Sequence, residues 1–275
     1  MIKLDPSLSK SERISVIATW IAALLVILFL MAPIITIVPL SFTSDSLLSY
    51  PIPDWSLRWY EVLFGSEMWM RALWNSLYIA FFATILAMIL GTVASVGLTS
   101  PNFPFKGAVM GLLLTPMIVP IIITAVASYF FYAKLGLTNT YLGMILAHAL
   151  LGTPFVVITV TATLLGFDTN QVRAAYSLGC KPIPTFFKIV VPQIQPGIIS
   201  GGLFAFVTSF DEVIVALFMA GTEQFTLPRQ MFAGIRENID PTIAAVATVM
   251  ILISLVLLLG VQWVTARSEK LRNKK

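Results

Sequence analysis

The chain of 275 residues is 58% hydrophobic and only 11% charged, with a mean hydropathy of +0.92. Soluble domains usually hold about 45–50% apolar and about 25% charged residues, so an integral membrane protein is expected. One cysteine and one histidine exclude an internal disulfide, a multi-cysteine metal cage and a paired-histidine zinc site. The motifs GxxxxGK[ST] and GxSxG are absent, so the chain carries no recognisable machinery for nucleotide hydrolysis or nucleophilic catalysis.

Six apolar runs are long enough to cross a bilayer, whose core of about 30 Å needs roughly 20 helical residues. They cover residues 14–39, 72–98, 107–133, 141–165, 198–220 and 241–265. The first run is too long for the apolar core of a signal peptide and lacks an A-x-A-like cleavage site, so it is kept as a true span. We therefore expect an all-α polytopic membrane domain at 14–266, between an N-terminal segment at 1–13 and a basic tail at 267–275.

The charges of the loops predict the orientation by the positive-inside rule. With the N-terminus inside, 12 lysines and arginines lie on the inner side and 5 on the outer side. Both termini are therefore expected in the cytoplasm, with an inner loop at 167–190 and outer loops at 41–71 and 222–240.

The two long outer loops differ in pattern. Residues 41–71 contain Trp55, Trp59, Tyr60 and Trp69 in a partly apolar arrangement, which suits a short helix at the headgroup level. Aromatic anchoring alone would give the same pattern. The loop at 222–240 ends at a proline that suits the start of the last helix.

Prolines interrupt two of the spans. Pro116 and Pro120 lie inside the third run, and Pro192 and Pro196 lie near the start of the fifth. Each proline frees backbone groups that neighbours or a water-filled cavity must satisfy in lipid. A lined pathway is one interpretation, and ordinary helix kinks are the other.

The inner segment 171–196 is unusually polar and rich in turn residues, reading QVRAAYSLGCKPIPTFFKIVVPQIQP. Asp168 or Thr169 can cap a short helix over 171–178, and Gly179 is suited to end it. The run 181–184, Lys-Pro-Ile-Pro, prevents that helix from continuing. From the residues alone, the segment is either a loop that fixes the topology or a docking surface for a cytoplasmic partner.

The same segment resembles the "EAA…G…IxLP" loop of binding-protein-dependent ABC importer permeases. The resemblance implies a type I importer permease fold with six spans, in which this loop contacts an ATP-binding subunit. It assigns the coupling contact to Arg173, Ala174, Ala175, Gly179, Ile189 and Pro192. Two positions depart from the pattern: Arg173 replaces the usual Glu, and Val191 replaces the usual Leu. The first departure reverses a charge and puts in doubt any salt bridge that the family's Glu makes.

Other segments resemble the spermidine/putrescine branch of these permeases: 55–60, 75–77, 209–213, 226–228, 231–232 and 234–236. This resemblance implies a bacterial inner-membrane permease that forms the pathway with a second permease, expected to be a different chain. Two partner ATPase subunits would hold ATP and Mg, and an extracytoplasmic solute-binding protein would dock on the outer loops. No cofactor is expected in this chain, and no nucleic-acid partner. Ferric ion, thiamine or an opine-type amine are alternative solutes within the same class.

Two acidic residues in the fifth run, Asp211 and Glu212, are the candidates for the substrate pathway. Acids at membrane depth cost roughly 2.5–3.5 kcal/mol at a helix centre, so they usually face a cavity or a partner. In a continuous helix Asp211 shares a face with Phe204 and Thr208, and Phe204 and Phe210 can attract an ammonium group. The alternatives are a structural carboxylate and an exposed outer rim.

Two further polar residues are expected to act in packing. His148 lies mid-span between small residues and is expected to bond a neighbouring helix rather than relay protons. Asn75 is expected to bond across a subunit interface or to cap its helix.

Two rival classes remain. An ion-coupled secondary transporter could use Asp211, Glu212 and His148 as a proton path, but its internal inverted repeat is not evident. An intramembrane protease needs a Ser/His or paired-Asp constellation, and a single histidine without GxSxG argues against it.

Overall fold

The computed structural model describes residues 9–237 and 240–272. Parts of three predicted segments lie outside these residues: 1–8 of the N-terminal segment, 238–239 of the second outer loop and 273–275 of the basic tail. The described residues are almost entirely helical, and their only strand-like pairing is an isolated bridge between Thr43 and Trp55. The chain divides into two compact units, residues 1–63 with 239–249 and residues 64–238 with 250–275.

The first unit holds the first span and the aromatic loop. Helix α1 (Lys10–Leu40) begins with a capping box, in which Ser9 Oγ accepts the Glu12 N–H and the Glu12 carboxylate accepts the Ser9 N–H. The loop after α1 folds back on the helix end, where the hydroxyls of Ser41 and Tyr60 lie 2.7 Å apart. Helix α2 (Arg58–Gly65) follows, which confirms the short helix predicted in the loop 41–71.

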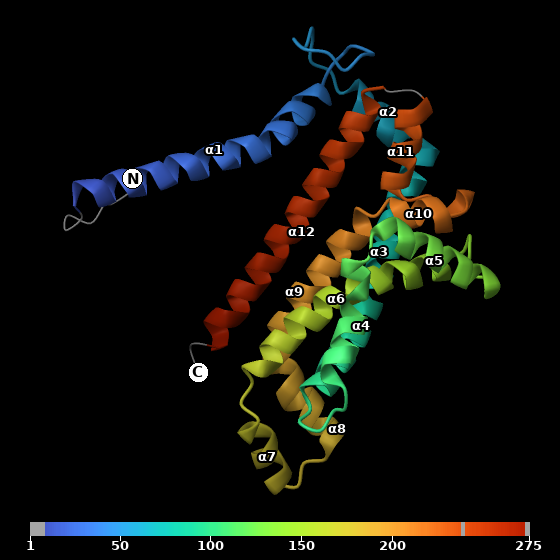
Figure 1. The fold of residues 1–275 in the computed structure, drawn as a ribbon. Coiled ribbons are helices and arrows are strands. Elements are labelled where there is room, and N and C mark those ends of the chain that lie inside the picture. The colour runs from blue at the N-terminus through green and yellow to red at the C-terminus, as the bar shows by residue number, and fades with distance from the viewer. Residues whose placement is uncertain (1–8, 238–239, 273–275) are drawn as a thin grey trace. The chain divides into compact units, whose positions relative to one another are not determined.

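The second unit is organised around three long helices, α3 (Glu67–Thr99), α6 (Tyr141–Leu165) and α9 (Val191–Phe210), which pack on one another (Figure 1). Small residues allow the close approach. A Cβ built on Gly91 would lie 2.6 Å from Val156 Cβ, and one on Gly201 would lie 2.6 Å from Val156 Cα. Because lipid offers no hydrophobic drive between helices, such tight packing and interhelical hydrogen bonds hold the core together. One of these bonds runs from Thr159 Oγ1 to the Gly197 carbonyl at 2.8 Å.

The third predicted span is two helices rather than one. Helices α4 (Lys106–Ile118) and α5 (Ile121–Lys134) meet at an angle of 105° around Val119 and Pro120. Proline lacks an N–H and disfavours a helical conformation in the residue before it, so the helix ends at this point. The third predicted span, 107–133, is therefore divided into two helices at one of the prolines that were expected to break its hydrogen bonds.

The fifth predicted span is shifted. The helix is continuous over Pro182–Phe210, through α8 (Pro182–Thr185), the π-helical turn η1 (Phe186–Val190) and α9. It therefore starts before residue 198, and Pro192 and Pro196 do not interrupt it. It also stops ten residues before 220, and a separate short helix, α10 (Ile214–Met219), follows.

The remaining elements complete the chain. Helix α7 (Asn170–Ser177) precedes α8, while η2 (Thr222–Gln224) and α11 (Leu227–Glu237) occupy most of the segment predicted as a second outer loop. The last helix is α12 (Thr242–Arg272). Over the described residues, five helices are long and apolar enough to cross a membrane, and there are six spans if the bent pair α4–α5 counts as one. The six predicted spans are confirmed in this sense.

Candidate functional site

The polar segment between α6 and α9 forms a compact helical turn at one end of the three-helix core, opposite α10 and α11 (Figure 1). Asp168 starts α7 by accepting the Asn170 N–H at 2.9 Å. Gly179 ends it with a φ of +79°, and the N–H groups of Gly179 and Cys180 reach back to the carbonyls of Tyr176 and Ala175 at 3.0 Å. This is a Schellman ending, which needs a left-handed residue and therefore favours glycine. The predicted helix start and stop are confirmed.

The residues of the family-like motif do not share one surface. Arg173, Ala174 and Gly179 are exposed, whereas Ala175 is buried as α7 packs on α8 and η1. Of the other two motif residues, Ile189 is half-buried and Pro192 is exposed. The two alanines therefore differ: Ala174 is exposed and can contact a partner, whereas Ala175 packs α7 against the rest of the chain.

Polar and apolar contacts attach α7 to the long helix that follows. The amide of Gln193 on α9 donates to the side-chain carbonyl oxygen of Gln171 on α7.

The segment also exposes four large apolar side chains that the motif does not include: Tyr176, Leu178, Ile183 and Phe187. Leu178 is 85% exposed and Ile183 is 73% exposed. Exposed apolar side chains of this size occur on surfaces that contact a partner protein or a membrane.

At the other end of α9, the predicted acidic pair divides between two environments. The helix ends at Phe210, so Glu212 does not continue it, and its side chain is only 6% exposed. Its Oε1 accepts the Val215 N–H at 2.8 Å, in the first turn of α10. Within this chain Glu212 is thus a buried carboxylate at the start of a new helix, and its assignment to the substrate pathway stays a prediction.

Asp211 keeps the predicted face. Its backbone N–H still bonds the Val207 carbonyl at 3.0 Å, so it lies in register with α9. Phe204 and Asp211 are exposed and Thr208 is half-buried, which leaves one face of α9 uncovered in this chain. Phe204 stacks on Phe155 of α6 with ring centroids 5.9 Å apart. Phe210, in contrast, is 2% exposed and stacks on another phenylalanine of its own helix, so it does not line this face.

His148 joins two of the core helices, as predicted. Its Nδ1 lies 2.8 Å from Ser209 Oγ and 3.2 Å from the Ser209 carbonyl oxygen, and its side chain is fully buried. The second nitrogen, Nε2, has no hydrogen-bond partner within the described residues. The contact links the first third of α6 to the last turn of α9.

Asn75 has a role that neither prediction described. Its amide nitrogen donates to the carbonyls of Glu223 and Phe225, at 2.8 and 2.9 Å. The hydroxyl of Tyr141 bonds both the Asn75 amide oxygen and the Glu223 carbonyl, each at 2.9 Å. These contacts, which we call the Asn75 clamp, hold the segment after α10 against the first turns of α3 and α6. Nothing in the sequence near Asn75 indicates a partner 148 residues away.

Arg229 on α11 contacts two residues at the same end of the second unit. Its Nε donates to the Ala216 carbonyl at 3.2 Å, and its guanidinium carbon lies 3.3 Å from the centroid of the Phe225 ring. Burial lowers the pKa of the Arg229 guanidinium from its ordinary value, but arginine stays protonated in proteins. Over the described part of the chain, no group of three His, Cys, Asp or Glu side chains could hold a metal ion.

Comparison with known sequences gives relatives along most of the chain. The spermidine/putrescine transport system permease protein PotC of Haemophilus influenzae is 34% identical over 242 residues, which cover 88% of this chain and 93% of the relative. The putrescine transport system permease protein PotI of Escherichia coli strain K12 is 34% identical over 253 residues, covering 89% of each.

Solved structures share the fold. A chain from a bacterial ABC transporter that imports the acidic polysaccharide alginate superposes with a TM-score of 0.77 at 16% identity, covering 94% of this chain and 99% of that one. The family model of binding-protein-dependent transport system inner membrane components matches residues 83–272. The chain therefore belongs to the family of binding-protein-dependent transport system inner membrane components.

Proposed function

We propose that this chain is a permease subunit of an ATP-driven importer for polyamines of the spermidine and putrescine type. The observation that carries the proposal is the 34% identity, over 88% of the chain, to a permease named for spermidine and putrescine transport. The fold by itself does not choose the solute, because a neighbour of the same fold belongs to an importer of an acidic polysaccharide. The choice of a cation rests on the relatives and on the chemistry of α9.

That chemistry is the Asp211 carboxylate and the Phe204 ring on an uncovered face of α9, with the Phe204 ring stacked on Phe155 of α6. Phe204 and Asp211 are seven residues apart on a helix, a rise of roughly 10 Å, which a flexible polyamine can bridge. A carboxylate binds an ammonium group by charge, and an aromatic face attracts one by its quadrupole. The second permease, expected to be a different chain, would close the opposite side of the pathway.

The coupling to ATP would enter through α7. Partner subunits carrying ATP and Mg would contact its exposed face, around Arg173 and Ala174, together with the exposed apolar side chains of the turn. The helix is continuous over Pro182–Phe210, and Gln171 and Ala175 attach α7 to it. A displacement of α7 would therefore be carried along a continuous helix to the face that holds Asp211.

The sidedness follows from the same proposal. The end of the core with α7 would face the cytoplasm together with both termini, in agreement with the 12 inner and 5 outer basic residues. The end with α10 and α11 would face outward, where a solute-binding protein delivers the substrate.

The test is ATPase activity of the complex, rebuilt in liposomes from this chain, its encoded second permease, ATPase and solute-binding protein. The panel is spermidine, putrescine, thiamine, ferric ion, an opine-type amine and a neutral sugar. We expect stimulation by the polyamines alone. Stimulation by another solute would refute the polyamine assignment, and uptake that responds to a protonophore but not to ATP depletion would refute the importer mechanism.

A further inference from the structure

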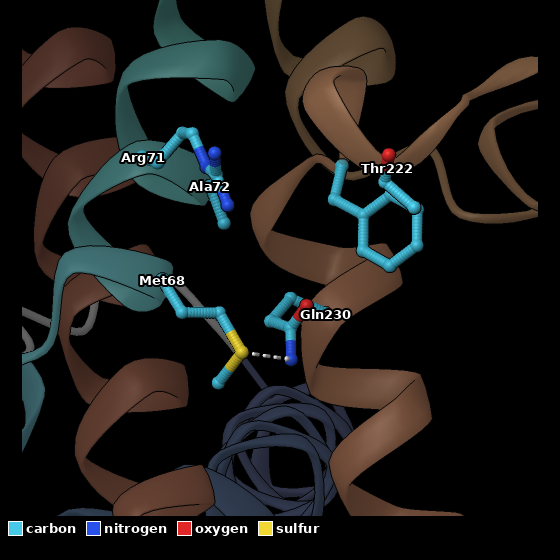
Figure 2. A pocket seen from close by; sticks show the side chains of 6 residues that line it. Met68, Arg71, Ala72, Thr222 and Gln230 are labelled. Carbon is cyan, nitrogen blue, oxygen red and sulfur yellow. Dashed lines mark hydrogen bonds between the residues drawn. The ribbon is translucent and has the colours of Figure 1, made fainter. Parts of the chain in front are cut away.

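A small cavity of about 160 Å³ lies between the start of α3 and the segment η2–α11, all within the second unit. Figure 2 shows Met68 and Arg71 on α3 and Gln230 on α11 around it. The cavity is lined by Met68, Arg71, Ala72, Thr222, Phe225 and Gln230.

The lining is rich in hydrogen-bond donors. The guanidinium of Arg71, the hydroxyl of Thr222 and the amide of Gln230 can all donate, and no carboxylate is among the lining residues. Ala72, Met68 and the Phe225 ring supply apolar walls. A charged donor with neutral donors and apolar walls suits a carboxylate on a short methylene stem, because arginine binds carboxylates by strong, charge-assisted hydrogen bonds.

A residue beside the cavity already imitates such a ligand. Glu223 Oε2 accepts from Arg71 Nη1 at 3.2 Å, and the two side chains are 66% and 46% exposed. Exposed ion pairs contribute little to stability, so an incoming carboxylate can replace Glu223 at small cost. The Asn75 clamp holds the backbone at Glu223 and Phe225, so the Phe225 wall stays in place when the Glu223 side chain leaves.

We propose that this cavity takes an Asp or Glu side chain of the extracytoplasmic solute-binding protein, which displaces Glu223 from Arg71. The occupant rests on the proposed function: the cavity lies at the end of the core opposite α7, which is the outer end when α7 faces the ATPase. Charge complementarity supports a protein acid, since Arg71 is the cationic group of the cavity. Glu223 would then act as an internal competitor that keeps the site closed until the binding protein docks.

The experiment titrates the solute-binding protein against the liposome complex and measures the half-saturating concentration for ATPase stimulation. Arg71→Gln should raise that concentration about tenfold, because it removes the cationic partner of the docking acid. Glu223→Gln should lower it several-fold, because it removes the competitor. Arg236→Gln is the matched control. Arg236 is exposed, as Arg71 is, but it lies on α11 outside the cavity. The half-saturating concentration of this variant should equal that of the parent complex.

Two results separate the outcomes. If the parent complex is stimulated by the binding protein and Arg71→Gln has the same half-saturating concentration, the docking role of the cavity is refuted while the importer function stands. If no binding protein stimulates the parent complex, the proposed function itself fails. A photo-cross-linking residue, Thr222→p-benzoylphenylalanine, should capture a surface peptide of the binding protein that contains Asp or Glu. Capture of lipid or of the second permease instead would overturn the proposal.

Discussion

The imidazole Nδ1 of His148 lies 2.8 Å from Ser209 Oγ, joining the first third of α6 to the last turn of α9. Both side chains are buried, so neither is placed to exchange protons directly with water. Ser209 lies two residues before Asp211, next to the end of α9 at Phe210. This packing contact therefore lies close to Asp211, the candidate acid of the proposed pathway.

Replacing the imidazole should lower the stability of the protein. His148→Phe keeps most of the ring volume but leaves Ser209 Oγ without its partner, and a buried unsatisfied polar group costs about 1–3 kcal/mol. We expect a lower thermal unfolding midpoint of the purified protein in detergent. Ser209→Ala should lower the midpoint less, because the backbone carbonyl of residue 209 remains as a partner for the imidazole. A native midpoint combined with lost transport would instead favour the proton-relay role of His148.

The packing between α6 and α9 allows a matched pair of glycine variants. Gly201→Ala would bring a Cβ within 2.6 Å of Val156 Cα, and overpacking of a core typically costs about 1–3 kcal/mol. Gly111→Ala on α4 has open space and should be neutral or stabilise the helix by about 0.5–1 kcal/mol. Unfolding midpoints in detergent compare the two, and equal midpoints would show that α6 and α9 are not in close contact.

The Asn75 clamp should control the order of the segment after α10. Asn75→Asp removes both amide donors and sets a carboxylate against two carbonyl oxygens, so residues 222–226 should exchange their amide hydrogens faster. Tyr141→Phe removes one shared donor and should have a smaller effect in the same direction. Hydrogen–deuterium exchange of the peptides covering 222–226 tests both variants. Trp74→Leu is the control: Trp74 is the neighbour of Asn75 in the sequence and is exposed, so its replacement should leave the exchange unchanged.

The long helices could be predicted from the sequence because each depends on local apolar length. The fourth predicted span, 141–165, matches α6 at both ends. The end of α9 could not be predicted in this way, since apolar residues resume after Asp211 and Glu212 and continue to Ala220. The bond in which Glu212 accepts the Val215 N–H shows that a new helix starts there. The angle between α4 and α5 depends on tertiary packing around Pro120, about which hydropathy carries no information.

In the candidate site, too, the local features could be predicted from the sequence and the tertiary contacts could not. The cap and stop of α7 are local features, so Asp168 and Gly179 were predicted correctly. Burial depends on what packs against each face, so the opposite exposures of Ala174 and Ala175 were not predicted. The Asn75 clamp and the cavity beside Arg71 join residues about 150 positions apart, and a single sequence gives no distance between them.

Gly179 offers a test of the proposed coupling role of the turn after α7, and the test separates backbone strain from charge. Its φ of +79° favours glycine and tolerates Asn and Asp better than other residues, and a Cβ there meets open space. Gly179→Asn should therefore keep most ATP-coupled uptake, whereas Gly179→Asp adds a negative charge to the exposed face and should abolish it without preventing membrane insertion. Gly179→Val should also impair uptake, by straining the turn.

Uptake in proteoliposomes, with the bound ATPase subunit measured by pull-down, distinguishes these effects. Equal uptake by the Asp and Asn variants would show that no partner surface lies against Gly179. Normal uptake by the Val variant would show that the left-handed turn is not needed for coupling.

The two neighbouring acids at the end of α9 should respond differently to neutralisation. Asp211→Asn keeps the shape of an exposed side chain, so the unfolding midpoint should not change, but uptake of a polyamine should fall about tenfold as an ammonium partner is lost, a change of about 1.4 kcal/mol. Glu212→Ala removes the acceptor of the Val215 N–H, and loss of such a cap costs about 0.5–2 kcal/mol, so this variant should unfold at lower temperature. Radiolabelled spermidine uptake and unfolding midpoints, measured on both variants, give the comparison. Asp211→Asn with parental uptake would move this residue from the pathway to the structural class, because a carboxylate that binds the passing cation cannot be neutralised without effect on transport.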